Sequence, residues 1–169
     1  MPDTFAALDA CFDQPAAFLT YRPAGGWSSA EILEHVSLTN HYLLKIIRKG
    51  VVKARRRAET RPIPPGESDL TPLAAIGHPD AFPWHRPDHM APTGATPLPE
   101  IRARLRHQQQ DCLELLDSMP NGAGALYTVR MSVQDLGKLD MYQWLYFLAL
   151  HAQRHLVEME RLAATYFKI

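Results

Sequence analysis

The chain has 169 residues, of which 46% are apolar and 21% charged, and its 18 basic and 18 acidic side chains cancel. This length predicts a single domain over residues 1–169 with a core of its own, and the composition excludes wholesale disorder. A formal charge of zero argues against a nucleic-acid partner. No apolar run is long enough for a transmembrane helix, so no membrane partner is expected.

Two cysteines, Cys11 and Cys112, stand far apart in the sequence. They form neither a metal-type pair nor a disulfide framework, which predicts a reducing, cytoplasmic location. The first residues also lack the basic and apolar regions of a secretory signal.

Apolar residues at helical spacing predict a first helix over about residues 3–19. Pro15 interrupts this run, so we expect a kink or break near Asp13 and Gln14.

Ser28 and Glu31 have the spacing of a capping box, and they predict the start of a second helix over about residues 28–49. Gly50 is the expected end of this helix. Continuation through Ala58 is the alternative.

Ten of the 14 prolines lie between Pro62 and Pro99, and proline prevents a long helix there. We therefore expect an irregular connection over about residues 60–96, with room for a short helix near 69–76. Connections of this length are uncommon in compact domains and are often functional.

A third helix is predicted over about residues 99–119, and a fourth over about 140–166, where Asp140 and Gln143 give a second cap signal. Residues 126–133 between them form either a short strand or a loop. Four helices with a proline-rich crossover between the second and third predict an all-α fold, a four-helix bundle.

Three histidines on two predicted helices form a candidate metal site. His151 and His155 stand one turn apart on the same face of the fourth helix, which is the spacing of helical metal-binding pairs. His35 borders the apolar stripe of the second helix. Such a triad would hold a divalent metal and leave positions for water. The alternative is three core histidines held by hydrogen bonds.

Glu31, Thr39 and Glu158 are candidates for hydrogen-bond partners of these histidines, and either glutamate could act as a general base. The alternative makes Glu31 only a cap partner and Glu158 a solvated charge. Arg154 is expected to point toward the polar side of its helix.

Three other features carry weaker hypotheses. His78, His85 and His89 cluster in the proline-rich connection as a second metal-site candidate. The basic run over residues 48–57 is interpreted as a solvated helix end that complements the helix dipole, with anion binding as the alternative. Neither cysteine has a neighbouring base, so no nucleophile is proposed.

Two segments resemble the DinB-like superfamily of metal-binding four-helix bundles. One segment, residues 22–35, contains the helix start Trp27-Ser28 followed by His35. The other, residues 139–156, carries His-x-x-x-His with an arginine before the final histidine. The resemblance implies that His35, His151 and His155 hold a divalent ion, zinc or nickel, and imidazole ligands fit both.

The resemblance also implies an activity. Characterised relatives include thiol-dependent S-transferases that use bacillithiol or mycothiol, and a mycothiol-dependent maleylpyruvate isomerase. It implies a metal-dependent homodimeric enzyme that acts on a small molecule with a low-molecular-weight thiol as cosubstrate, in a pocket shaped by residues 60–96. The alternatives are a metal-dependent hydrolase, a non-catalytic metal-containing stress-response or binding protein, and a bundle whose histidines serve only structure.

Overall fold

The computed structural model describes residues 2–84 and 86–168, which are mostly helical. The α-helices are α1 (Pro2–Cys11), α2 (Ala16–Thr20), α3 (Ser29–Ala58), α4 (Leu98–Asp117) and α5 (Met141–Tyr166). The 3-10 helices are η1 (Thr71–Gly77), η2 (Asp88–Met90), η3 (Pro120–Leu126) and η4 (Val133–Asp135). The strands are β1 (Thr128–Met131) and β2 (Gly137–Asp140).

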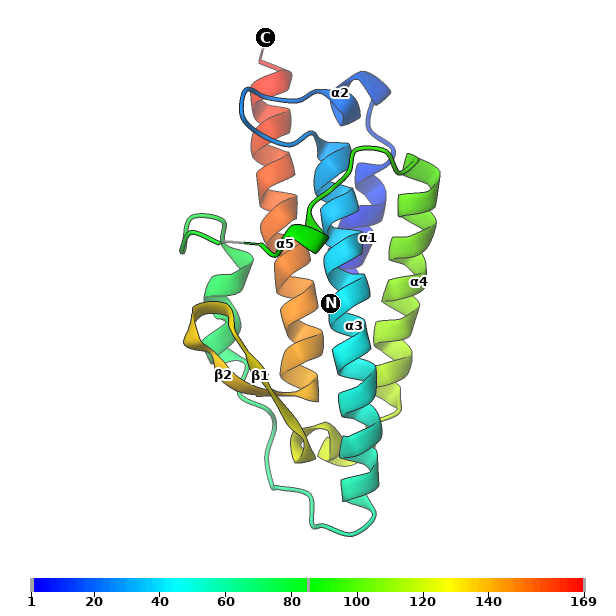
Figure 1. Cartoon of the computed structure of the whole chain (residues 1–169), viewed down its shortest axis with the longest axis vertical. Coiled ribbons are helices and arrows are strands. Elements are labelled where there is room, and N and C mark those ends of the chain that lie inside the picture. The colour runs from blue at the N-terminus through cyan, green and yellow to red at the C-terminus, as the bar shows by residue number, and fades with distance from the viewer. Residues whose placement is uncertain (1, 85, 169) are drawn as a thin grey trace.

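The long helices lie side by side along the long axis of the molecule (Figure 1). Helices α3 and α5 run in opposite directions and contact each other, while α4 packs against the other side of α3 and α1 contacts both α4 and α5. The 3-10 helix η1 lies against α5, and the hairpin of β1 and β2 leads into the start of α5. None of the helices described here is both long and apolar enough to cross a membrane.

A single buried cluster joins these elements. Leu33, Val36 and Ile47 of α3 and Leu148 and Ala152 of α5 have no exposed surface and belong to it. Burying apolar surface contributes roughly 25 cal/mol per Å². The two helices that carry the histidines are therefore fixed against each other by the core.

Both predicted cap signals are present. The Ser28 hydroxyl accepts from the Glu31 amide and the Glu31 carboxylate accepts from the Ser28 amide at 2.9 Å. At the start of α5, the Asp140 carboxylate accepts from the Gln143 amide and the Gln143 side chain accepts from the Asp140 amide, both at 2.9 Å. These reciprocal bonds satisfy amides that have no partner within the helix.

Two predicted helix boundaries need correction. The first predicted helix is two helices, α1 and α2, because Pro15 separates them, as the expected break near this point indicated. The predicted end of the second helix at residue 49 is wrong, and α3 continues to Ala58. A glycine in a helix interior costs only about 1 kcal/mol, and burial of Val51 and Ala54 beyond Gly50 offsets this.

The chain between the long helices contains more structure than an irregular connection. The short helix expected near residues 69–76 is the 3-10 helix η1, which buries Leu73 and Ile76. Residues 126–133 include a strand, since β1 pairs with β2 in an antiparallel hairpin that sets Arg130 opposite Lys138. The all-α prediction did not include this small sheet.

Candidate metal centre

The structure brings the three predicted histidines together. His35 comes from α3, and His151 and His155 come from α5. One ring nitrogen of each lies within 4.8 Å of the other two, and the Nε2 atoms of His151 and His155 are 3.2 Å apart. All three residues are at least 93% buried, which excludes a solvated surface cluster.

Hydrogen bonds to the far ring nitrogens orient two of these imidazoles. His35 Nδ1 donates to the backbone oxygen of Met90 at 2.7 Å, and His155 Nδ1 donates to Glu158 Oε2 at 2.7 Å. Carbonyl and carboxylate oxygens only accept, so each Nδ1 carries the proton. Each Nε2 therefore presents a lone pair, the arrangement that metal-binding histidines commonly have.

The surroundings of His35 and His151 keep these two imidazoles neutral. Burial, together with the charge on His155 and Arg86, lowers the pKa of His35 to about 4. Burial, followed by the charge on His155 and His35, lowers the pKa of His151 well below its ordinary value. Neutral imidazole is the form that binds a metal.

The donor set fits a divalent cation. His151 Nδ1 is buried with no hydrogen-bond partner among the described residues, while its Nε2 faces the lone pair of His155 Nε2. In either tautomer of His151, the described residues leave its buried Nδ1 without a hydrogen-bond partner, which is costly. A cation between the three rings would accept their lone pairs, and imidazole suits both zinc and nickel.

A cavity of about 910 Å³ opens beside the three histidines. One wall comes from residues 82–84, 86–88 and 90 of the connection, so part of the segment expected to shape a pocket does line it. The other wall comes from residues 130–134 of the hairpin, which sequence reasoning did not place at the site. A cavity of this size suits a small molecule.

The three predicted partners of the histidines lie in different settings. Glu158 contacts His155 directly. Thr39 lines the cavity, and its buried hydroxyl has no partner among the described residues. Glu31 bonds Ser28 and Arg22, and none of its hydrogen bonds goes to a histidine, so its observed role is in the helix cap.

Sequence reasoning missed Glu34, which is only 2% exposed. Its carboxylate accepts from the hydroxyls of Thr93 and Thr96, both at 2.7 Å, and from the amides of Thr93 and Gly94 at 3.1 and 2.8 Å. Burial alone would raise the pKa of Glu34, but these bonds outweigh it and lower the pKa. Helical periodicity places Glu34 opposite the apolar stripe of α3, so the sequence carried no signal of its burial.

The expectation for Arg154 is wrong. Its side chain is buried, and it donates to the backbone oxygens of His78, Pro79 and Phe82 at 2.6, 2.7 and 3.2 Å. The guanidinium also lies over the rings of Phe82 and Trp84. The connection covers this face of α5, which a helical wheel alone leaves to solvent.

The weaker hypotheses fare differently. Within the described residues, the metal-ligating side chains close enough to share an ion are His35, His151 and His155. His78 is exposed, His89 packs against the ring of Tyr42, and His85 lies outside the described residues. The described structure therefore assembles no second site from the connection histidines.

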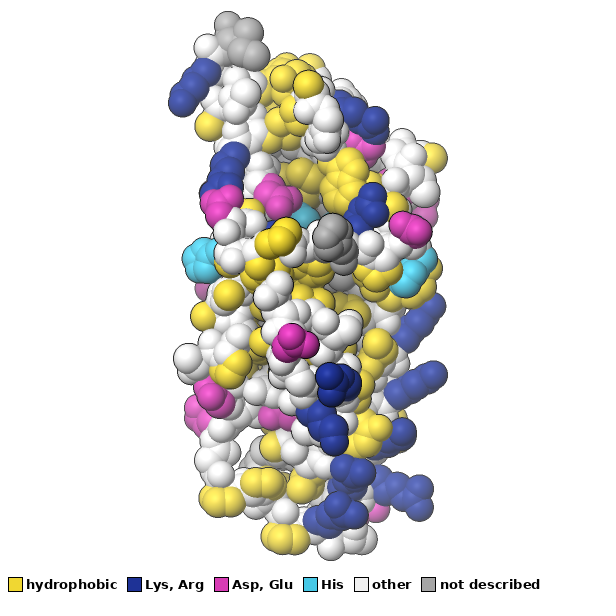
Figure 2. All heavy atoms as spheres, turned by 60° about the vertical axis from the view of Figure 1, so that its left-hand side comes forward, with side chains coloured by type: hydrophobic (Ala, Val, Ile, Leu, Met, Phe, Trp, Pro, Cys, Tyr) yellow, Lys and Arg dark blue, Asp and Glu magenta, His cyan; other side chains and the backbone are white. Residues whose placement is uncertain are grey.

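The basic run does more than surround a helix end. Arg57 donates to the backbone oxygen of Leu126 at 2.8 Å, and Lys53 donates to the Tyr127 hydroxyl at 3.1 Å. Figure 2 shows Lys and Arg side chains gathered over the lower part of the molecule. Part of the run thus attaches the segment after α4 to α3.

Three imidazoles that converge beside a cavity, held by packed helices, define a helical protein with a histidine cluster positioned to hold a metal ion. The sequence model of the DinB superfamily matches residues 3–159, so the chain belongs to this superfamily. No curated protein matches the chain, and neither does a solved structure.

Proposed function

We propose that the protein is a divalent-metal-dependent enzyme that joins the sulfur of a small thiol to a carbon of an electrophilic small molecule, giving a thioether. His35, His151 and His155 are the proposed ligands of a zinc or nickel ion. The observation that carries the proposal is the convergence of their ring nitrogens within 4.8 Å beside a cavity of about 910 Å³. Three protein ligands leave coordination positions for an incoming group, as in catalytic sites.

A divalent cation in this site supplies Lewis acidity, which lowers the pKa of a thiol or a water molecule. The chain's own residues prepare the ligands for it. Met90 and Glu158 hold the protons of His35 and His155 on Nδ1, away from the centre. Burial keeps His35 neutral at physiological pH.

The nucleophilic thiol must come from a cosubstrate. Burial raises the pKa of Cys11 to about 11 and that of Cys112 to about 12, so both thiols are protonated near neutral pH. Neither residue lines the cavity. In the transfer, the sulfur forms a bond to a substrate carbon, the leaving group departs with the bonding electrons, and the thiol proton is released.

We also propose that α1, α3, α4 and α5 form a four-helix bundle with residues 60–96 as its crossover, and that two copies associate as a homodimer. The mutual contacts of these helices support the bundle. Exposed apolar side chains such as Val52, which is 67% exposed, and the zero formal charge support association. Light scattering coupled to size exclusion tests the dimer, and a monomeric mass would overturn it.

Elemental analysis of protein purified without added metal tests the centre. We expect about one zinc or nickel ion per chain in the wild type and none in His151→Ala. His107→Ala is the matched control, because His107 is an exposed histidine on α4 whose side chain is 77% exposed. Equal metal content in both variants would refute the ligand assignment.

Product analysis then tests the reaction. The metal-loaded protein is incubated with bacillithiol, mycothiol or glutathione and an aromatic halide, and mass spectrometry identifies the product. A thioether that forms with wild type but not with His151→Ala supports S-transfer. A hydroxylated product without thioether assigns hydrolysis, and a metal-loaded protein without any product assigns a non-catalytic role.

A further inference from the structure

Two arginines line the cavity without a carboxylate partner. Arg86 lies on the connection and Arg130 on β1, so they belong to the two segments that form its walls. Neither takes part in an ion pair or side-chain hydrogen bond among the described residues. Elsewhere Arg102, Arg106 and Arg161 are each paired with an aspartate.

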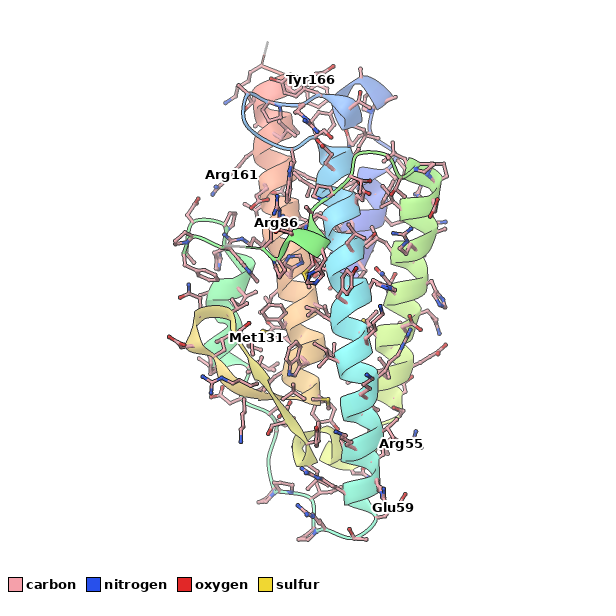
Figure 3. The ribbon with its side chains drawn as sticks, viewed as in Figure 1. Arg55, Glu59, Arg86, Met131, Arg161 and Tyr166 are labelled. Carbon is pink, nitrogen blue, oxygen red and sulfur yellow. The ribbon has the colours of Figure 1, made fainter. Side chains whose placement is uncertain are left out.

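The neighbours of these two arginines supply no negative charge. The Arg86 guanidinium lies over the Trp27 ring, 5.0 Å from its centroid. The cross-strand neighbour of Arg130 is Lys138, and like charges directly opposite each other are unfavourable unless an anion lies near them. Figure 3 labels Arg86 beside η2 and Met131, the residue after Arg130, on the hairpin.

The remaining charges of the cavity leave a cationic excess. Arg154 is occupied by three backbone oxygens, and Glu158 is occupied by His155. Asp88 is then the one lining carboxylate without a side-chain partner among the described residues. The cavity lining thus carries two exposed, unpaired guanidinium groups and this single carboxylate, which favours an anionic ligand over a neutral or cationic one.

We propose that the substrate is a small carboxylate with an apolar body, and that Arg86 and Arg130 bind its carboxylate groups. Guanidinium binds carboxylate through two parallel hydrogen bonds. The apolar lining, which includes Trp84, Trp144 and Phe147, takes the rest of the molecule. This inference rests on the proposed enzyme function and names its substrate class.

The tryptophans provide a direct readout. All three tryptophans of the chain, Trp27, Trp84 and Trp144, line this cavity, so quenching of intrinsic fluorescence reports on its occupancy. The probes are 3-phenylpropionate and its uncharged amide, 3-phenylpropanamide, titrated into zinc-loaded and chelated protein. We expect the carboxylate to bind about tenfold more tightly than the amide, a ratio typical of a hydrogen bond to a charged group.

Charge-removing variants locate the binding groups. Arg86→Gln and Arg130→Gln should each weaken carboxylate binding about tenfold and leave amide binding unchanged. Asp88→Asn should strengthen carboxylate binding. Arg55→Gln is the matched control, because Arg55 is exposed near the end of α3, far from Arg86 (Figure 3), and its variant should bind like wild type.

The outcomes separate this inference from the proposed metal function. Equal affinity for the two probes, or no saturable quenching by the carboxylate, overturns the substrate class. A carboxylate preference that both arginine variants keep, but that disappears on chelation, assigns the carboxylate to the cation and overturns the arginine assignment. Metal content is measured in the same samples. If the protein fails to bind zinc but the arginine dependence of carboxylate binding is intact, only the metal proposal is refuted.

Discussion

Glu34 and His35 are neighbours on α3 but hold different parts of the site. His35 contributes a ring nitrogen to the centre, whereas Glu34 binds Thr93, Gly94 and Thr96 of the connection. The same connection also contains Met90, whose backbone oxygen accepts a hydrogen bond from His35. The carboxylate therefore acts on the centre by fixing the segment that carries the carbonyl.

Replacing Glu34 with glutamine should lower the free energy of unfolding by about 1–3 kcal/mol at pH 7, because two amides and two hydroxyls lose their charged acceptor. The pKa of Glu34 is lowered in the folded protein. The stabilisation is therefore complete above the ordinary glutamate pKa and is lost as pH falls through the lowered one. Urea denaturation of wild type and variant between pH 7 and acid pH measures the difference, which should shrink with acidification.

Glu100→Gln is the control for this comparison, because Glu100 forms an exposed pair with Arg104 within α4. Exposed pairs of this kind contribute less than about 0.5 kcal/mol. A pH-independent difference between wild type and the Glu34 variant would contradict the assigned role of its charge.

Glu158→Gln should weaken metal binding about 10- to 100-fold, which is the usual effect of removing the carboxylate that orients a metal-binding histidine. Glu158 accepts the Nδ1 proton of His155. Competition with a chromophoric chelator measures the dissociation constant. Glu160→Gln changes the same charge at an exposed position of α5 and should leave the constant unchanged; equal losses would show that only net charge matters.

Among the elements, α3 and α5 approach closely near Gly50. A Cβ atom built on Gly50 would collide with the sulfur of Met141 and lie 2.9 Å from its terminal methyl carbon. Met141 has no exposed surface, so it has no free space to move into. The glycine that sequence reasoning took as a helix end is instead the point where the start of α5 packs against α3.

Gly50→Ala should destabilise the protein, although alanine in place of glycine favours a helix by about 1 kcal/mol. Overpacking in a filled core typically costs about 1–3 kcal/mol, which exceeds the gain in helix propensity. Thermal denaturation measures the change. The double variant Gly50→Ala with Met141→Ala relieves the collision, and a double variant no better than the sum of its single changes would reject this explanation.

At the scale of the whole molecule, the cation should stabilise the fold because the unfolded chain lacks the assembled site. Chelation is expected to lower the melting temperature of wild type and leave that of His151→Ala unchanged. Differential scanning calorimetry with and without chelator measures both. If the chelator leaves the melting temperature of the wild type unchanged, the result would favour the alternative in which the histidines have only a structural role.

The sequence predicted what depends on local pattern. Both capping boxes, the break at Pro15 and the pairing of His151 with His155 follow from local pattern. The addition of His35 to that pair depended on the predicted bundle and the family resemblance. Contacts made by the connection were beyond such reasoning. The burial of Glu34 and Arg154 arises because residues 93–96 and residues 78–82 cover faces that periodicity assigns to solvent. Helical pattern says nothing about where an irregular segment lies.

The centre joins segments that are distant in the chain. His35 lies near its start, whereas His151 and His155 lie near its end. Contacts between residues so far apart form slowly, because a long loop must close first. A chain still emerging during synthesis, with α3 complete but α5 not yet made, has one imidazole of the three. Binding of a cation by all three imidazoles would therefore follow the synthesis of α5, and a bound ion would mark a molecule in which α3 and α5 have already docked.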